Sequence, residues 1–300
     1  MRRGKRRPAK IDDGLPTNSA QPIAGYPEKP DKMRGLQTTG KTTLWERNSM
    51  FNYDAVHMRY EPYPLAVLRP ALDEKLYNEL AASFPSVGIF GKIPKYDYKL
   101  SLSERLNSSE YHKFIRSNET WQRFHSWVKS EDFIRQTVAF LVRQNVDLGL
   151  DEAFETPSRR LSGIAKSLLS GHLPHRRLRL RTRFEFSVLK ADGGEVSPHT
   201  DTPKKIITLV LSMIRAGEWQ PEFGGGLDIN RATDNAFAFN WKNRVVPWDK
   251  VETIETIPMV PNQCTVFVKT FNSLHSVRKM QQAGSNALRK TITIVIEKDE

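Results

Sequence analysis

The pattern of apolar residues changes near residue 176, and this change restricts the possible folds more than any other feature. From there on, side chains suited to a protein interior alternate with charged ones. The first set is Leu178, Leu180, Thr182, Phe184 and Phe186, and the second is Arg177, Arg179, Arg181, Arg183 and Glu185. A period of two residues indicates a strand that buries one face. The C-terminal part of the chain is therefore predicted to be β structure.

Further short strands are predicted beyond this one, separated by turns that contain Gly, Pro or Asn. They span residues 206–213, 226–229, 236–240, 253–258, 265–270 and 291–297. The preceding part shows helical spacing, as in Trp121, Phe124 and Val128, which share one helical face. Ser130 is a predicted helix start. This order predicts an α+β fold in which helices cover one face of a β-sandwich or barrel.

The domain boundaries follow from composition. Residues 1–60 are rich in Pro, Gly and basic residues without sustained periodicity, which predicts a basic, flexible N-terminal arm. Residues 61–300 are predicted to form a single domain. It begins with a strand at 63–69 and continues as a helical layer over about 70–170 and a β core over about 176–298.

The chain carries 46 Lys and Arg against 34 Asp and Glu, a formal charge of +12. This excess permits nucleic acid as a partner without favouring it. The single cysteine, Cys264, cannot close an intrachain disulfide, and the longest apolar runs are shorter than the roughly 20 residues of a membrane helix. We therefore expect a cytoplasmic protein without a membrane span.

The most informative local motif is His199-Thr200-Asp201, which precedes the apolar segment 206–213. In extended backbone, residues two apart project to the same side, so an imidazole and a carboxylate can reach one metal ion. His275 follows the apolar segment 265–270 and is expected at a strand end on the facing sheet. Two His and one carboxylate on one face of a metal are typical of non-haem Fe(II) oxygenases.

A buried cation is predicted beyond His275. In segment 289–296, Arg289 and Thr291 point into the barrel. The three isoleucines of the segment, Ile292, Ile294 and Ile296, point toward the helices. A buried guanidinium beside a hydroxyl suits the distal carboxylate of a dicarboxylate cosubstrate. Lys290 or Arg278 would take this role if the strand register slipped by one residue.

With these motifs, the sequence resembles the 2-oxoglutarate and Fe(II)-dependent oxygenase superfamily, in particular its prolyl-hydroxylase-like branch, from about residue 63 to 296. His199, Asp201 and His275 match the iron ligands of the family. Arg289 and Thr291 match its Arg-x-Ser/Thr cosubstrate anchor. The run Gly224-Gly-Gly-Leu matches a glycine pair often seen midway, whereas Leu189 replaces the usual aromatic residue about ten positions before the first His.

The resemblance implies a double-stranded β-helix core (jelly-roll, cupin-like) behind the helical layer. It also implies Fe(II), 2-oxoglutarate and O2 as metal and cosubstrates, with release of succinate and CO2. Because halogenating members replace the carboxylate ligand by a small residue, the retained Asp201 favours hydroxylation, or demethylation through hydroxylation of a methyl group. Two alternatives remain open, a cupin-like metal-binding isomerase or binding protein, and a nucleic-acid-directed oxygenase.

The substrate itself is not identified by the sequence. Arg183 and Lys205 are the candidate substrate contacts, and the arginine strand favours an anionic substrate. The competing interpretation is that acids of the helical layer cover these arginines, with the candidates Glu104, Glu110, Glu131 and Asp132. Binding of single-stranded nucleic acid would require aromatic residues interleaved with basic ones, and residues 1–10 contain none.

Overall fold

The computed structural model describes residues 49–93, 96–150 and 178–299. Most of the predicted N-terminal arm, residues 1–48, and the end of the predicted helical layer, residues 151–177, lie outside this part. No helix in the described ranges is long and apolar enough to cross a membrane.

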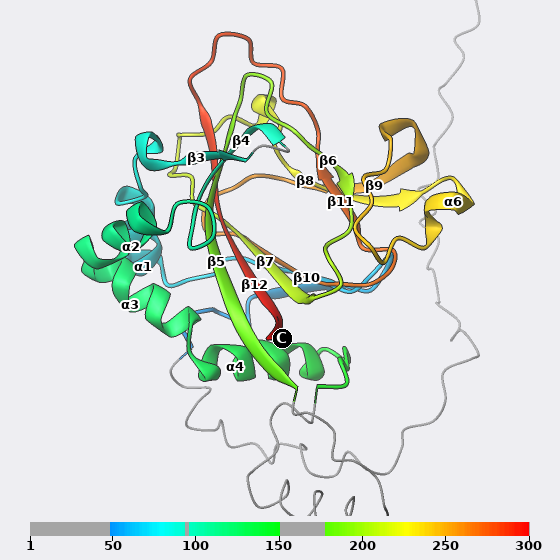
Figure 1. The fold of residues 1–300 in the computed structure, drawn as a ribbon, viewed down its shortest axis with the longest axis horizontal. Helices are drawn as coiled ribbons and strands as arrows, with labels where there is room; N and C mark the ends of the chain where they lie inside the picture. Colours follow the sequence, from blue (N-terminus) through cyan, green and yellow to red (C-terminus); the bar gives the residue numbers. More distant parts are fainter. Residues whose placement is uncertain (1–48, 94–95, 151–177, 300) are drawn as a thin grey trace, which may run out of the picture. The chain divides into compact units, whose positions relative to one another are not determined.

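Two antiparallel sheets form the core of this part of the chain (Figure 1). The larger sheet has the order β1-β2-β10-β7-β12-β5-β4-β3, and the smaller has the order β6-β11-β8-β9. The larger sheet contains β1 (Val56–Arg59), β2 (Leu65–Leu68), β3 (Gly91–Ile93), β4 (Tyr96–Ser103), β5 (Arg179–Lys190), β7 (Lys205–Ser212), β10 (Cys264–Val268) and β12 (Leu288–Asp299). The smaller contains β6 (Val196–His199), β8 (Leu227–Ala232), β9 (Val251–Ile257) and β11 (Leu274–Val277).

The two faces of the larger sheet pack against different parts of the protein. Its outward side chains, such as Phe184, Leu209 and Ile294, are fully buried in one cluster with side chains of the helices. Its inward side chains meet those of the smaller sheet in a second cluster, which includes Leu65, Ile229 and Phe267. The alternation along β5 and β12 therefore separates a helix-covered face from an interior face, as predicted.

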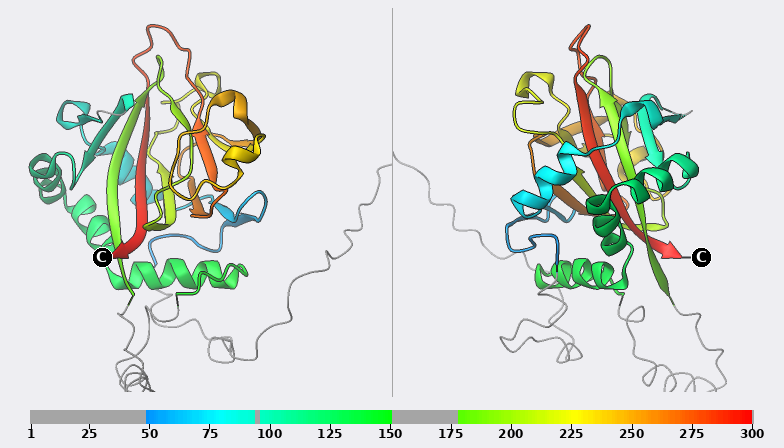
Figure 2. Two further views of the ribbon diagram at one scale, coloured as in Figure 1. Left: turned by 45° about the vertical axis from the view of Figure 1, so that its right-hand side comes forward. Right: turned by 90° about the vertical axis from the view of Figure 1, so that its left-hand side faces the viewer.

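The helices α1 (Glu74–Ala82), α2 (Ser108–Ser117), α3 (Glu119–Val128) and α4 (Glu131–Arg143) pack beside the larger sheet (Figure 2). The predicted face of α3 is confirmed, since Trp121, Phe124 and Val128 are all fully buried. Ser130 is confirmed as the start of α4, because its hydroxyl accepts a hydrogen bond from the backbone N–H of Phe133.

Three expectations are corrected. The folded part begins before residue 61, because β1 pairs with β2 and Phe51 is 3% exposed. The expected helical layer contains a hairpin, β3–β4, which extends the larger sheet beside β5. Residues 236–240 form no strand, because α6 (Asn235–Ala238) is a short helix capped by Asp234, and Phe239 is 67% exposed.

Candidate metal centre

The three side chains predicted as metal ligands lie together on the smaller sheet, so His275 is in the same sheet as His199 and not on a facing sheet as expected. His199 ends β6, Asp201 follows it, and His275 lies on β11. His199 and His275 are paired directly across the two strands, with ring centroids 4.5 Å apart. One potential ligand atom from each of the three residues lies within 4.8 Å of the others. The sheet register therefore converts a motif and a distant histidine into one cluster.

Backbone hydrogen bonds fix both histidine rings in one tautomer. Nδ1 of His199 lies 2.8 Å from the carbonyl oxygen of Ser197, and Nδ1 of His275 lies 3.0 Å from that of Ser273. Because a carbonyl oxygen only accepts, both Nδ1 atoms carry the proton. Each Nε2 keeps its lone pair, which is the state that a metal ligand requires.

The charge states of the three side chains also suit a metal. Burial, together with the neighbouring His275, lowers the pKa of His199 to about 3, and burial likewise lowers the pKa of His275. Burial alone would raise the pKa of Asp201, but Lys205 and the two imidazoles outweigh it and hold this pKa below its usual value. At neutral pH the cluster therefore offers two neutral imidazoles and one carboxylate.

Both oxygens of the Asp201 carboxylate have protein partners. Thr208 on β7 donates its hydroxyl to Oδ2 at 2.6 Å, and the ammonium group of Lys205 donates to Oδ1. Lys205 thus contacts the candidate centre through Asp201. Thr208 was not among the predicted residues, and its only sequence signal is a hydroxyl within the apolar run 206–211.

Arg289 lies in a separate cavity between the two sheets. The cavity is lined by residues that include Val210, Ser212, Leu227, Thr265, Arg289 and Thr291. Arg289 is 6% exposed, and its Nε donates to the carbonyl oxygen of Gly225 at 2.5 Å. Burial lowers the pKa of Arg289 to about 10, and no carboxylate in the described ranges pairs with its guanidinium. The predicted inward direction of Arg289 and Thr291 is therefore confirmed.

The neighbouring cations point elsewhere. The ammonium group of Lys290 pairs with Glu218, and the 64% exposed side chain of Arg278 pairs with Asp228. The glycine run leaves room for the side chain of Arg289 beside the backbone of Gly225. A Cβ added at Gly225 would lie 3.2 Å from Cδ of Arg289 and 2.9 Å from the sulfur of Met280, and the φ of Gly225 is +72°.

Ser212 is a further polar group of this cavity. Its hydroxyl is buried and has no hydrogen-bond partner among the described residues. It lies opposite Thr291 in the pairing of β7 with β12. An unpartnered buried hydroxyl beside an unpaired guanidinium is a polar environment without a counter-charge.

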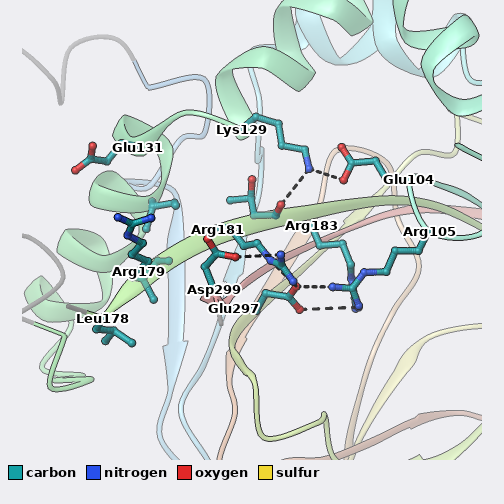
Figure 3. Close-up of a pocket in the computed structure, with 13 residues that line it drawn as sticks. Glu104, Arg105, Lys129, Glu131, Leu178, Arg179, Arg181, Arg183, Glu297 and Asp299 are labelled. Carbon is teal, nitrogen blue, oxygen red and sulfur yellow. Dashed lines mark hydrogen bonds and ion pairs between the residues drawn. The ribbon is translucent and has the colours of Figure 1, made fainter. Parts of the chain in front are cut away.

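Arg183 does not contact the three candidate ligands. It lines a pocket at the end of the larger sheet where Glu297 is buried (Figure 3). Glu297 pairs with Arg105 at 2.8 Å and with Arg181 at 3.0 Å, and its second oxygen lies 3.9 Å from Arg183. The acids that cover the arginines of β5 thus lie mainly on β12. The competing interpretation had expected them in the helical layer.

The sheet register nevertheless relates Arg183 to the metal-ligand cluster. Arg183 is paired with Val295 on β12, and Val295 is paired with Thr208 on β7. Thr208 is the residue that holds Asp201. Arg183 therefore lies two strands from Thr208 in one row of the interior face.

Comparison with known proteins gives similarity only at the level of solved structures. No family model matches the chain, and no curated protein matches it. A prolyl-4-hydroxylase from Pseudomonas putida is 14% identical with a TM-score of 0.41, over 78% of this chain and 92% of that chain. A prolyl hydroxylase from Trichoplax adhaerens, in complex with a hypoxia inducible factor peptide fragment, is 13% identical with a TM-score of 0.37, over 78% and 83%.

An oxidoreductase of the 2OG-Fe(II) oxygenase family from Burkholderia pseudomallei is 10% identical with a TM-score of 0.39, over 78% of this chain and 84% of that chain. Identities and scores this low leave the chemistry to be argued from the side chains of this protein. The solved structures that this chain resembles include 2-oxoglutarate/Fe(II) oxygenases, among them prolyl hydroxylases.

Proposed function

We propose that the chain is a non-haem Fe(II)- and 2-oxoglutarate-dependent dioxygenase with a double-stranded β-helix core. The strand order supports this core. From β5 to β12, the strands are divided between the two sheets, with β5, β7, β10 and β12 in the larger and β6, β8, β9 and β11 in the smaller. A jelly-roll divides its strands between two facing sheets in this way, so the division supports the proposed core.

The observation that carries the proposal is the His199, Asp201 and His275 cluster. Two imidazoles and one carboxylate favour Fe(II) and leave three adjacent coordination positions open. The rings present unprotonated Nε2 atoms, and Asp201 is ionised. The donor set therefore fits the metal that the resemblance implies.

Arg289 supports 2-oxoglutarate as the cosubstrate. A buried guanidinium without a carboxylate partner is costly unless an anion joins it. The distal carboxylate of 2-oxoglutarate would supply that anion, with the hydroxyls of Ser212 and Thr291 as further donors. A cupin-like isomerase or binding protein would have no use for this arrangement.

Bound iron would supply the activation of O2 coupled to oxidative decarboxylation of 2-oxoglutarate. The residues of this chain have simpler tasks. His199, Asp201 and His275 would hold the metal, Arg289 would position the cosubstrate, and Thr208 orients Asp201 by its hydrogen bond. The apolar side chains of the cavity, Val210 and Leu227 among them, limit the access of water. Hydroxylation or oxidative demethylation of a substrate is the expected outcome.

The experiment is an anaerobic reconstitution with Fe(II) and 2-oxoglutarate, followed by exposure to O2. We expect uncoupled succinate and CO2 formation that needs all three components. The substrate can then be sought as a gain of one oxygen in fractionated extract by mass spectrometry. Binding of Fe(II) without any oxygen-dependent loss of 2-oxoglutarate would favour the cupin-like alternative and overturn the proposal.

A further inference from the structure

Three exposed aromatic side chains gather beside the candidate metal centre. Phe239 and Trp241 lie in the segment between β8 and β9, and Phe271 lies in the turn between β10 and β11. They are 67%, 42% and 46% exposed, respectively. The rings of Phe239 and Phe271 stack with centroids 5.2 Å apart and planes 16° apart. We name these three residues the aromatic rim. Exposed rings in one group mark an interaction site more often than isolated ones do.

Hydrogen bonds connect the aromatic rim to segment 199–201, which carries two of the three candidate metal ligands. Asn240, fully buried between the two rim residues Phe239 and Trp241, donates its backbone N–H to the carbonyl of Phe271 at 2.8 Å. Its own carbonyl accepts from the hydroxyl of Thr200 at 2.5 Å. Thr200 lies between His199 and Asp201, so the rim is tied to the ligand pair by one residue. Figure 1 shows α6 on the same side of the fold as β6 and β11.

Basic side chains are interleaved with the aromatic ones. The ammonium group of Lys269 lies 4.9 Å from the ring centroid of Trp241, and the guanidinium of Arg244 lies 5.5 Å from that of Phe237. Residues 231–250 and 269–278 contain more basic than acidic side chains. The basic ones are Arg231, Lys242, Arg244, Lys250, Lys269 and Arg278, and the acidic ones are Asp234 and Asp249. Because Lys250 pairs with Asp234 and Arg278 with Asp228, the surplus on the surface comes from the exposed Arg231, Lys242 and Arg244.

This combination distinguishes between classes of partner. A site that binds an apolar peptide or a neutral sugar gains nothing from a surplus of cations, because neither ligand carries negative charge. Single-stranded nucleic acid uses both, because its bases stack on aromatic rings while its phosphates meet Lys and Arg. In a duplex the base faces are not available for such stacking. The charge and the rings together therefore favour a single strand.

We propose that the aromatic rim and its basic neighbours bind single-stranded nucleic acid and present one nucleotide to the metal centre. The role of this surface as a substrate site rests on the proposed function, whereas binding itself does not. The exposed faces of the Phe239–Phe271 stack would contact the bases, and the exposed Lys242 and Arg244 would pair with phosphates. Lys269 is 8% exposed and donates to the carbonyls of Asn240 and Thr270, so it supports Trp241 from below the surface. Both DNA and RNA offer this chemistry.

The test is fluorescence anisotropy with short fluorescein-labelled oligothymidylate and oligouridylate, using the full chain. The double variant Phe239→Ala/Phe271→Ala changes exposed side chains and should fold. Since a base–aromatic stack contributes about 1 to 3 kcal/mol, we expect affinity to fall about 5- to 150-fold. The control is Tyr98→Ala, which removes a 46% exposed ring that packs beside Gly193, near the far end of β5. This control should bind as the unchanged chain does.

The basic N-terminal residues will add charge-driven binding, which is separable because it is shared by all variants and weakens at raised salt. Unlabelled duplex and heparin serve as competitors that offer charge without free bases. Competition by heparin as strong as by the single strand, or equal affinity of the double variant and the unchanged chain, would overturn the proposal. Rim-dependent binding of an acidic peptide but not of oligonucleotides would overturn it in favour of a polypeptide. Preference between thymidylate and uridylate distinguishes DNA from RNA.

The proposed dioxygenase function is tested separately, by measuring succinate formation in the absence of oligonucleotide. If the chain binds oligonucleotides through the rim but does not consume 2-oxoglutarate, the dioxygenase proposal fails and the binding surface stands. If it consumes 2-oxoglutarate and the rim variants leave oligonucleotide affinity unchanged, only the nucleic-acid proposal fails.

Discussion

The ammonium group of Lys205 is bonded to the carboxylate of Asp201, a candidate iron ligand four residues earlier. Both side chains are largely buried, so this ion pair is little screened by solvent. The cation of Lys205 thus stands at one of the two carboxylate oxygens that a metal would use. Metal binding must displace Lys205 or share the oxygen with it.

We therefore expect Lys205→Met to bind a divalent metal more tightly than the unchanged chain. A charge-assisted hydrogen bond contributes about 1.5 to 3 kcal/mol, so its removal should raise the affinity about tenfold or more. Calorimetric titration with Mn²⁺ measures the change, and Lys204→Met is the matched control at an exposed lysine. Weaker binding by Lys205→Met would show instead that Lys205 holds Asp201 in position for the metal.

The second prediction concerns the metal ligands. His275→Ala should abolish both stoichiometric metal binding and succinate formation, because the cluster then keeps only two donors. The fold should persist, since open metal sites contribute less to folding than closed structural ones. Metal content and circular dichroism check the two statements, with His112→Ala on α2 as the control. A His275→Ala protein that binds one metal per chain with full activity would remove the assignment.

The third prediction concerns the cosubstrate. Arg289→Ala should weaken 2-oxoglutarate binding by about 2 to 5 kcal/mol, the cost of breaking a buried charge pair. The apparent KM for 2-oxoglutarate in uncoupled turnover measures this effect. Lys290→Ala is the neighbouring control, because its ammonium group pairs with Glu218 on the other side of the strand. Loss of cosubstrate binding in Lys290→Ala with retention in Arg289→Ala would contradict the observed register.

The sequence was sufficient where a short-range period determined the structure. Residues two apart on a strand share a face, which placed Arg289 with Thr291 on β12. His199 and Asp201 do come together as expected, although β6 ends at His199 and Asp201 lies just beyond it. The outward isoleucines of β12 follow from the same alternation. The strand register of β6 with β11, which brings His275 to His199, needed the resemblance, because each of these strands has only four residues.

Contacts between distant segments were beyond prediction. Glu297 neutralises Arg181 from a strand more than a hundred residues later, and the pairing depends on the register of β5 with β12. The Lys205 contact with Asp201 depends on the turn between β6 and β7. The strand expected at 236–240 is absent for a different reason. Its alternating Phe237 and Phe239 imitate a strand, but Asp234 caps a short helix there.

The fourth prediction is a pH dependence of stability. The His125 ring and the ammonium group of Lys129, which donates to Glu104 at 2.8 Å, lower the pKa of Glu104 to about 2. A carboxyl group with a lowered pKa stabilises the fold above its unfolded-state pKa, and this contribution is lost as pH falls toward 2. Glu104→Gln should therefore lower the free energy of unfolding at pH 7. The difference from the unchanged chain should shrink below about pH 4.5. Urea unfolding at several pH values measures it, and a pH-independent difference would contradict the assignment.

The last prediction concerns Arg183 as a substrate contact. Its Nε is buried without a hydrogen-bond partner among the described residues, and its nearest carboxylate, that of Glu297, already serves Arg105 and Arg181. The guanidinium of Arg183 can thus form a further hydrogen bond. Through Val295, Arg183 lies in the same cross-strand row of the larger sheet as Thr208. An anionic group on the substrate would have a fixed partner there.

Arg183→Ala should leave the fold intact, since Glu297 keeps two arginine partners. We expect turnover of anionic candidate substrates to fall at least about tenfold, the effect of one lost charge-assisted hydrogen bond. Matched neutral candidates and the KM for 2-oxoglutarate should change little. Arg179→Ala, at the exposed start of β5, is the control that removes the same charge farther along the strand. An equal loss for anionic and neutral candidates, or a loss of folding, would assign Arg183 to the structure of the larger sheet.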